Sequence, residues 1–348
     1  MNAGDGRQTP TPDAEHSTAG KAQNGATSLI PRIKIPLPVK IAASVLLLAF
    51  VLLKVDLTAF LRVVAGANLA LILLAAAVAF GAYLINTFKW QVLLSGSGAH
   101  VPYWDLLWLN FIGIFYNVVL PGQVGGEVIK GVRLSRAGVA GGIAAISVVA
   151  DRVTGLLALL VLGVGGAILS PSVTSGRTDL VLWVVGLTLV LGAATVVLVT
   201  GRGVAPVVAA GKALRLPGGN VLSRIGAPFE QLPRGSRGLS SLWLPMLLAL
   251  AFQLCIVYSN LLICMALGIP VTYLSLLWVV AVVSFLQSLP ISLAGIGVRE
   301  GAFVYLLGLQ GIAAPSALAL SLIVFAIQIA MAIVGGLLQL LDLRGRKA

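Results

Sequence analysis

The sequence predicts an all-α integral membrane protein with about six full spans and two re-entrant helical hairpins of opposite orientation that form an inverted repeat. The first observation is composition: of 348 residues, 59% are hydrophobic and 10% are charged, with a mean hydropathy of +1.04. Soluble domains carry about 25% charged residues. The second is a series of apolar runs of about 20 residues, the length that crosses a bilayer. The third is a pair of apolar segments that each break at Leu-Pro and continue with glycines.

The chain divides into three parts by composition. Residues 1–34 are rich in small and polar residues and are predicted to be a disordered cytoplasmic tail, because they offer too little apolar surface to bury. Residues 35–341 form the transmembrane domain, which includes a basic cytoplasmic loop at 201–240, and residues 342–348 form a basic cytoplasmic tail. The formal net charge of +12 comes from basic residues between apolar runs, so it indicates membrane topology rather than nucleic acid binding.

Six apolar runs are interpreted as full spans. The first has a basic flank and a short core that resemble a signal peptide, but we interpret it as an uncleaved anchor because everything after it is also membrane. The spans are expected at about residues 39–53, 68–88, 139–169, 180–200, 242–267 and 316–341.

No metal or cofactor is expected from the residues that usually hold one. The only histidines are His16 in the tail and His100 in a loop, and Cys255 and Cys264 lie nine apart in one apolar run. Nine residues of helix point two side chains in opposite directions about 13 Å apart, which also excludes a disulfide between them.

Two further segments, 105–136 and 272–315, are expected to enter and leave the membrane on the same side. Proline removes a backbone donor and glycine loosens the backbone, so each apolar helix should end at its break. If the first segment crossed completely, nine basic residues in two loops would lie outside, whereas a re-entrant hairpin places them inside. The residues at the breaks are Pro121, Gly122, Gly125, Gly126, Pro290, Gly295 and Gly297.

The spans around the two hairpins run in opposite directions, so the chain is predicted to contain an inverted repeat with both termini in the cytoplasm. Irregular backbone at membrane depth must be covered by protein or line a wet cavity. Transporters built from inverted repeats hold their sites near the bilayer midplane, between the repeats. Two facing hairpins are therefore expected to enclose a polar cavity.

Polar side chains in and near these segments are the candidate substrate-binding residues. A lone charge at the centre of a spanning helix costs on the order of 3 kcal/mol, so such groups usually face partners or water. Asn117 precedes the first break as a neutral hydrogen-bonding group, and the start of the short helix after it should offer free backbone amides to an anion. The candidates are Asn117, Glu127, Lys130, Arg133, Asp151, Arg152, Arg299 and Glu300.

The pairing of these charges has several solutions. Glu127 and Lys130 are three apart, so they share a helix face and can pair. Asp151 is expected to pair with Lys130 or Arg299, and Arg152 with Glu127 or Glu300. An ion-pair lock that holds the repeats together is an alternative to a binding role, and the two roles do not exclude each other.

Isolated amides and tryptophans receive simpler interpretations. The amides are interpreted as hydrogen-bonding contacts between helices rather than ligand groups: Asn86, Gln253, Asn260, Gln287 and Gln328. The tryptophans near span ends are interpreted as interfacial anchors: Trp90, Trp104, Trp108, Trp243 and Trp278.

Three motifs in fixed order carry a resemblance to a known family. They read N-x-x-L-P-G-x-x-G-G-E-x-x-K at 117–130, D-R-x-x-G-L at 151–156 and G-x-G-x-R-E-G at 295–301. Over about residues 40–341 the chain resembles the flippase-like transmembrane family of lysylphosphatidylglycerol synthases. The resemblance implies a multi-span protein associated with moving aminoacylated phospholipids or other lipid-linked molecules between leaflets. Full synthases carry a soluble aminoacyl-transferase domain after the membrane part, so transfer of lysine to lipid is not implied here and no enzyme activity is expected.

The leading functional hypothesis is a lipid translocase of the plasma (inner) membrane. The headgroup of an anionic or zwitterionic membrane lipid would enter the charged cavity while its tails stay in the bilayer. The basic candidates would hold the phosphate, and the carboxylates would tune their charge or contact an amine. No ATP-binding motif occurs, so transport is expected to be passive or coupled to an ion. The alternatives are a non-transporting scaffold or accessory subunit of a lipid-modifying enzyme, docked through 201–240, and a membrane enzyme acting on lipid phosphates.

Overall fold

The computed structural model describes residues 56–119, 125–170, 182, 185–186, 188–190, 243–288, 292 and 294–345. Several predictions lie outside these ranges: the N-terminal tail, the span at 39–53, the basic loop at 201–240, most of the span at 180–200, and the breaks at Pro121, Gly122 and Pro290. Across the described ranges every regular element is a helix, as the sequence predicts.

Four helices are long and apolar enough to cross a membrane, by length and composition. They confirm the spans predicted at 68–88, 139–169, 242–267 and 316–341, and with them a multi-pass membrane protein. These helices are α4 (Leu69–Ser95), α7 (Gly141–Leu169), α12 (Trp243–Ala266) and α15 (Ala314–Gly345).

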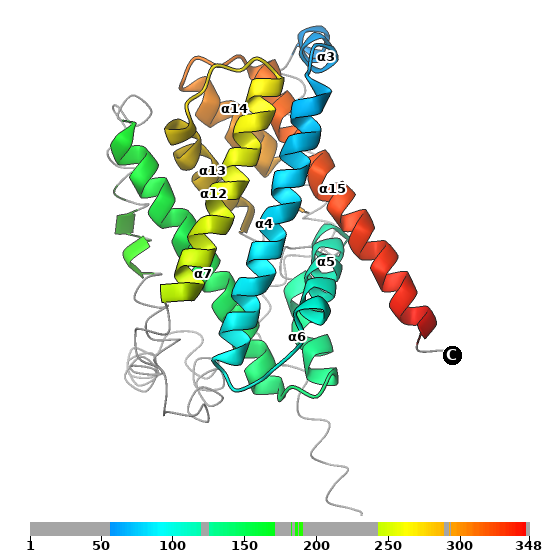
Figure 1. The fold of residues 1–348 in the computed structure, drawn as a ribbon. Coiled ribbons are helices and arrows are strands. Elements are labelled where there is room, and N and C mark those ends of the chain that lie inside the picture. The colour runs from blue at the N-terminus through cyan, green and yellow to red at the C-terminus, as the bar shows by residue number, and fades with distance from the viewer. Residues whose placement is uncertain are drawn as a thin grey trace, which may run out of the picture.

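Shorter helices come in two pairs, and residues 120–124, between the helices of the first pair, lie outside the described residues. The first pair is α5 (Tyr103–Val119) with α6 (Gly125–Arg136), and the second is α13 (Tyr273–Ser288) with α14 (Val298–Gly308). Before α14, Gly295 and Gly297 have φ of +78° and +83°, a region that favours glycine. Figure 1 shows α5 and α6 toward one end of the long helices and α13 and α14 toward the opposite end.

The first half of the described chain, with α4 to α7, and the second half, with α12 to α15, pack on each other reciprocally. Helix α4 runs along α12, α5 packs on α15, and α13 packs on α7. Glycines on the long helices permit close approach: a Cβ at Gly335 of α15 would overlap the backbone carbonyl of Phe111 on α5. On α7, a Cβ at Gly166 would lie 2.8 Å from the Leu274 carbonyl oxygen of α13. The last long helix of each half, α7 or α15, therefore packs against the first short helix of the other half, α13 or α5.

A short surface helix, α3 (Leu57–Ala65), precedes α4. The Asp56 carboxylate accepts hydrogen bonds from the Thr58 hydroxyl at 2.7 Å and from the Thr58 and Ala59 amides. The Thr58 hydroxyl, followed by the Ala59 amide, holds the pKa of Asp56 below its ordinary value. Asn68 caps α4 in the same way through the Ala70 amide.

The tryptophans do not all lie where an interfacial anchor would. Trp90 is fully buried and Trp278 is 2% exposed, so the anchor interpretation is wrong for both. Trp278 belongs to the largest apolar cluster, and Trp90 packs in a second cluster with Leu94 and Leu106. Trp104 and Trp243 are exposed, as an anchor requires.

Candidate functional site

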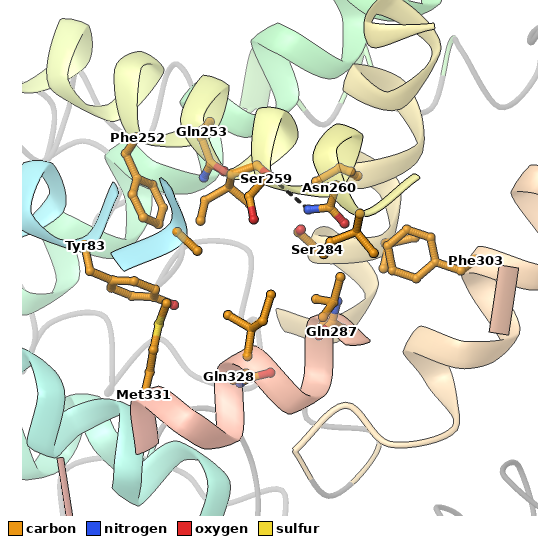
Figure 2. Close-up of a pocket in the computed structure, with 17 residues that line it drawn as sticks. Tyr83, Phe252, Gln253, Ser259, Asn260, Ser284, Gln287, Phe303, Gln328 and Met331 are labelled. Carbon is orange, nitrogen blue, oxygen red and sulfur yellow. Dashed lines mark hydrogen bonds between the residues drawn. The ribbon is translucent and has the colours of Figure 1, made fainter. Parts of the chain in front are cut away.

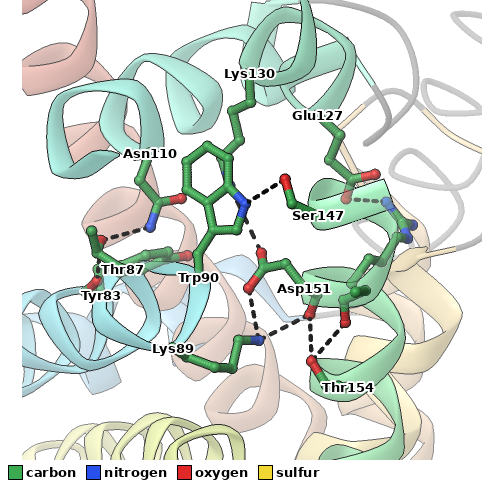
Figure 3. A network of polar contacts seen from close by, with 12 residues as sticks. Tyr83, Thr87, Lys89, Trp90, Asn110, Glu127, Lys130, Ser147, Asp151 and Thr154 are labelled. Carbon is green, nitrogen blue, oxygen red and sulfur yellow. Dashed lines mark hydrogen bonds and ion pairs between the residues drawn. The ribbon is translucent and has the colours of Figure 1, made fainter. Parts of the chain in front are cut away.

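Five charged side chains lie near one another between α4, α6 and α7 in two ion-paired sets, which together we call the charged network (Figure 3). Helix α4 supplies one of them, and α6 and α7 supply two each. Together they carry three positive and two negative charges. The network consists of Lys89, Glu127, Lys130, Asp151 and Arg152.

Asp151 is the centre of the first set, which also contains Lys89 and Lys130. Its Oδ1 lies 3.0 Å from Lys89 Nζ, and its Oδ2 lies 4.0 Å from Lys130 Nζ. Lys89 Nζ also donates to the Asp151 backbone carbonyl at 2.9 Å. Lys130 Nζ lies 4.8 Å from the centroid of the Trp90 ring, a cation–π distance. Of the two partners expected for Asp151, the structure has Lys130.

Lys89 is a functional candidate that sequence reasoning missed. The span was expected to end at Phe88, one residue before it, and a lysine beside a tryptophan at a span end is typical of the membrane interface. In the structure α4 continues to Ser95, and the Lys89 side chain is 2% exposed. The only signal in the sequence was Asp151 of the D-R motif, an acid within an apolar run that requires a cation as its partner.

Arg152 and Glu127 form the accessible edge of the network. Their side chains are ion-paired, and they are 25% and 24% exposed. Arg152 Nη2 also donates to the Ser288 carbonyl at the end of α13, at 3.1 Å. Of the two partners expected for Arg152, the structure has Glu127.

Asn117 connects the two helices of the first pair. Its Oδ1 accepts a hydrogen bond of 2.8 Å from the Gly126 amide at the start of α6. The expectation of free amides for an anion is therefore not met at Gly126. A Cβ at Gly126 would overlap the Gly113 carbonyl, and a Cβ at Gly113 would lie 3.0 Å from Lys130 Cε, so both glycines permit the close packing of α5 on α6.

The remaining candidates lie in other contacts. Arg133 of α6 donates to Gln339 Oε1 of α15. Arg299 pairs with its neighbour Glu300, and both side chains are 1% exposed. Glu300 accepts from the Gly297 amide at 2.6 Å and from the Ser321 hydroxyl at 3.2 Å, and the Phe325 ring lies 4.4 Å from the Arg299 guanidinium carbon. The contacts of Arg299 and Glu300 with Ser321 and Phe325 join α14 to α15, away from the charged network.

A cavity of about 320 Å³ lies between α4, α12, α13 and α15 (Figure 2). Its wall is apolar and aromatic with a set of uncharged polar groups. Of the described residues that line it, none is charged. The polar lining residues are Tyr83, Gln253, Ser259, Asn260, Ser284, Gln287 and Gln328. Four of these are amides that the sequence led us to interpret as contacts between helices.

The cavity adjoins the charged network on two sides. Gln253 Nε2 donates to the Gly155 carbonyl at 3.2 Å, and a Cβ at Gly155 would lie 3.5 Å from Lys89 Nζ. On the other side, Arg152 binds the carbonyl of Ser288, one turn beyond Ser284 on α13. A group in the cavity and a group at Arg152 could therefore belong to one ligand.

The fold and the site define a multi-pass helical membrane protein with ionised groups beside a mainly apolar cavity that carries uncharged polar groups. The chain matches the family described as lysylphosphatidylglycerol synthase TM region over residues 38–336, and it belongs to that family. The match confirms the resemblance seen in the three motifs and indicates a lipid-related membrane function. Comparison with curated proteins gives no match.

Proposed function

We propose that this protein is a lipid translocase that moves a phospholipid with an anionic headgroup between leaflets of the plasma membrane. The observation that carries the proposal is the Arg152–Glu127 pair, which is partly exposed and bound to the end of α13, a helix that lines the cavity. The network has one more positive than negative charge, which a phosphate would neutralise. Arg152 suits this role because its planar guanidinium can bind two phosphate oxygens at once.

The depth of the cavity fits a headgroup path through the membrane. Tyr83, Gln253 and Gln328 line it, and each lies near the middle of a long apolar helix. Polar groups at that depth are expensive in contact with acyl chains, so they typically mark a substrate pathway. In our proposal the headgroup passes along these groups while the tails remain in the bilayer.

The two pairs of short helices are, in this proposal, re-entrant hairpins of an inverted repeat. The reciprocal packing of α5 on α15 and of α13 on α7 supports this arrangement. Alternating exposure would then come from rocking of one repeat against the other. In this arrangement both termini lie in the cytoplasm. The chain carries out no catalytic step, and transport is passive or coupled to an ion.

Reconstitution of the purified full chain into vesicles with headgroup-labelled lipids tests the proposal. The label on the outer leaflet is destroyed chemically, and the rate at which inner-leaflet label becomes reactive reports translocation. We expect faster movement of phosphatidylglycerol than in protein-free vesicles, and a loss of about tenfold or more for Arg152→Gln. Arg62→Gln on the exposed helix α3 removes the same charge outside the site and should leave the rate unchanged.

Two results would contradict the proposal. The first is equal rates in protein-containing and empty vesicles for every headgroup. The second is an Arg152→Gln variant that folds and transports like the parent chain. Either result would favour the scaffold hypothesis, which needs the membrane part only as a docking partner for a lipid-modifying enzyme.

A further inference from the structure

The cavity is chemically different from the charged network beside it. Its polar groups are carboxamides and hydroxyls from α12, α13 and α15, together with Tyr83 of α4. A carboxamide both donates and accepts hydrogen bonds. The hydroxyl groups of a polyol ring do the same, so the two kinds of group can pair with each other. The cavity volume lies at the lower end of the range for small-molecule sites, about 300 to 1,000 Å³.

Asn260 supplies a second, independent observation that points to a ligand. The residue is 5% exposed and lines the cavity. Its Nδ2 donates to the Ile256 carbonyl at 2.9 Å, whereas its Oδ1 has no hydrogen-bond partner among the described residues. A buried acceptor without a partner is destabilising, and the hydroxyl of a bound ligand would satisfy it.

The absence of charge among the described lining residues restricts the ligand. An ammonium or carboxylate in this cavity would lose part of its hydration without gaining a counter-charge from the described lining residues, which is unfavourable. An uncharged group with several hydroxyls gains hydrogen bonds from the amides, and its ring carbons can pack on Phe252 and Phe303.

We propose that the cavity binds an uncharged, hydroxyl-rich group, a cyclitol or a sugar, and that this group is the part of the headgroup beyond the phosphate. The assignment of the phosphate to Arg152 rests on the proposed translocase function. The contacts of Gln253 with Gly155 and of Arg152 with Ser288 bring the two subsites side by side, so one phospholipid headgroup reaches both. The substrate class is then a phosphoinositol or phosphoglycosyl lipid rather than a lipid with an added amino group.

Lipid binding to the purified full chain, measured by native mass spectrometry in an amine oxide detergent, tests this assignment. A detergent with a sugar headgroup is avoided because it would compete for the cavity. The probes are phosphatidylinositol, phosphatidylglycerol and phosphatidylethanolamine with identical acyl chains, and free inositol. We expect phosphatidylinositol to bind roughly fivefold more tightly than phosphatidylglycerol, as one or more net hydrogen bonds would give.

Two cavity variants and one control make the test specific. Asn260→Leu and Gln328→Leu should each reduce the preference for phosphatidylinositol toward parity. Gln91→Leu removes an amide of α4 that donates to the Val101 carbonyl outside the cavity, and it should keep the preference. Thermal unfolding of each variant identifies any that fail to fold. Gln328 is only half-buried, so we expect Gln328→Leu to disturb folding less than Asn260→Leu.

Equal binding of phosphatidylinositol and phosphatidylglycerol, or a preference that survives both leucine variants, would overturn the assignment. Binding of free inositol as tight as that of the lipid would assign the cavity to a free polyol and overturn the lipid substrate class. These outcomes are distinct from failure of the translocase proposal. If phosphatidylglycerol crosses in an Arg152-dependent way but no headgroup preference exists, only this inference fails.

Discussion

Arg152, within the apolar helix α7, donates a 3.1 Å hydrogen bond to the carbonyl oxygen of Ser288, the last residue of α13. The same guanidinium pairs with Glu127 in the first turn of α6. The last carbonyls of a helix lack intrahelical partners, so Arg152 also caps α13. One side chain thus connects a short helix of each pair, and any movement of one pair relative to the other must change this contact.

Arg152→Lys should separate charge from geometry at this position. Lysine keeps the positive charge, but its single ammonium cannot reproduce the fork that binds Glu127 and the Ser288 carbonyl together. We expect transport to fall about tenfold and the free energy of unfolding to fall by about 1 to 2 kcal/mol, because one charged hydrogen bond is lost. Vesicle transport and thermal unfolding measure the two effects, with Arg62→Lys as the exposed control. Wild-type values in both assays would contradict the bridging role.

Lys89→Met tests the buried cation that the sequence did not reveal. Methionine fills a similar volume but leaves Asp151 with Lys130 alone, and removing one partner of a buried ion pair costs about 3 kcal/mol or more. The double variant Lys89→Met with Asp151→Leu removes both charges and should recover part of the lost stability. Chemical unfolding of the single and double variants measures their coupling. If Lys89→Met alone is neutral, the Lys89–Asp151 pair contributes nothing to folding.

Among the described residues, the sequence predicted the four long apolar helices and the glycine turn before α14 well, because each depends on local chemistry. The length of an apolar run and the positions of glycines are both set by residues close together in the sequence. Pairing of charges was predicted only as alternatives, since it depends on how helices distant in the sequence rotate against each other. The sequence therefore predicted Lys130 as a partner of Asp151 but missed Lys89. It predicted a charged cavity between the hairpins and not the uncharged one that the structure has, whose amides come from three different helices.

Gly126→Ala and Gly131→Ala form a matched pair on α6. A Cβ at Gly126 would overlap the Gly113 carbonyl of α5, whereas a Cβ at Gly131 meets nothing within 4 Å. Overpacking against backbone costs about 1 to 3 kcal/mol. Gly131→Ala should be neutral or stabilising by up to about 1 kcal/mol, because alanine has the higher helix propensity. Equal unfolding temperatures for the two variants would show that α5 and α6 do not pack closely in the membrane.

Cysteine labelling should show that each pair of short helices begins and ends on one side of the membrane. The background is Cys255→Ser with Cys264→Ser, and a membrane-impermeant thiol reagent is applied to sealed vesicles. His100→Cys and Ser135→Cys flank the first pair on exposed positions, and Thr272→Cys and Ala313→Cys flank the second. The first two should react from the cytoplasmic side and the last two from the opposite side. Opposite labelling of His100→Cys and Ser135→Cys would mean that the first pair crosses completely.

The Arg299–Glu300 pair allows an ion-pair lock to be distinguished from a substrate site. Both side chains are 1% exposed, and Glu300 also accepts from the Gly297 amide, so the pair joins the start of α14 to Ser321 on α15. Arg299→Met leaves a buried carboxylate without its cation and should destabilise the protein by about 3 kcal/mol or more. The double variant Arg299→Met with Glu300→Leu removes both charges, and replacing a buried pair with apolar residues is often close to neutral. We expect this double variant to regain most of the stability and to transport lipid at a rate close to the parent. A stable double variant that transports no lipid would instead place Arg299 or Glu300 in the headgroup path.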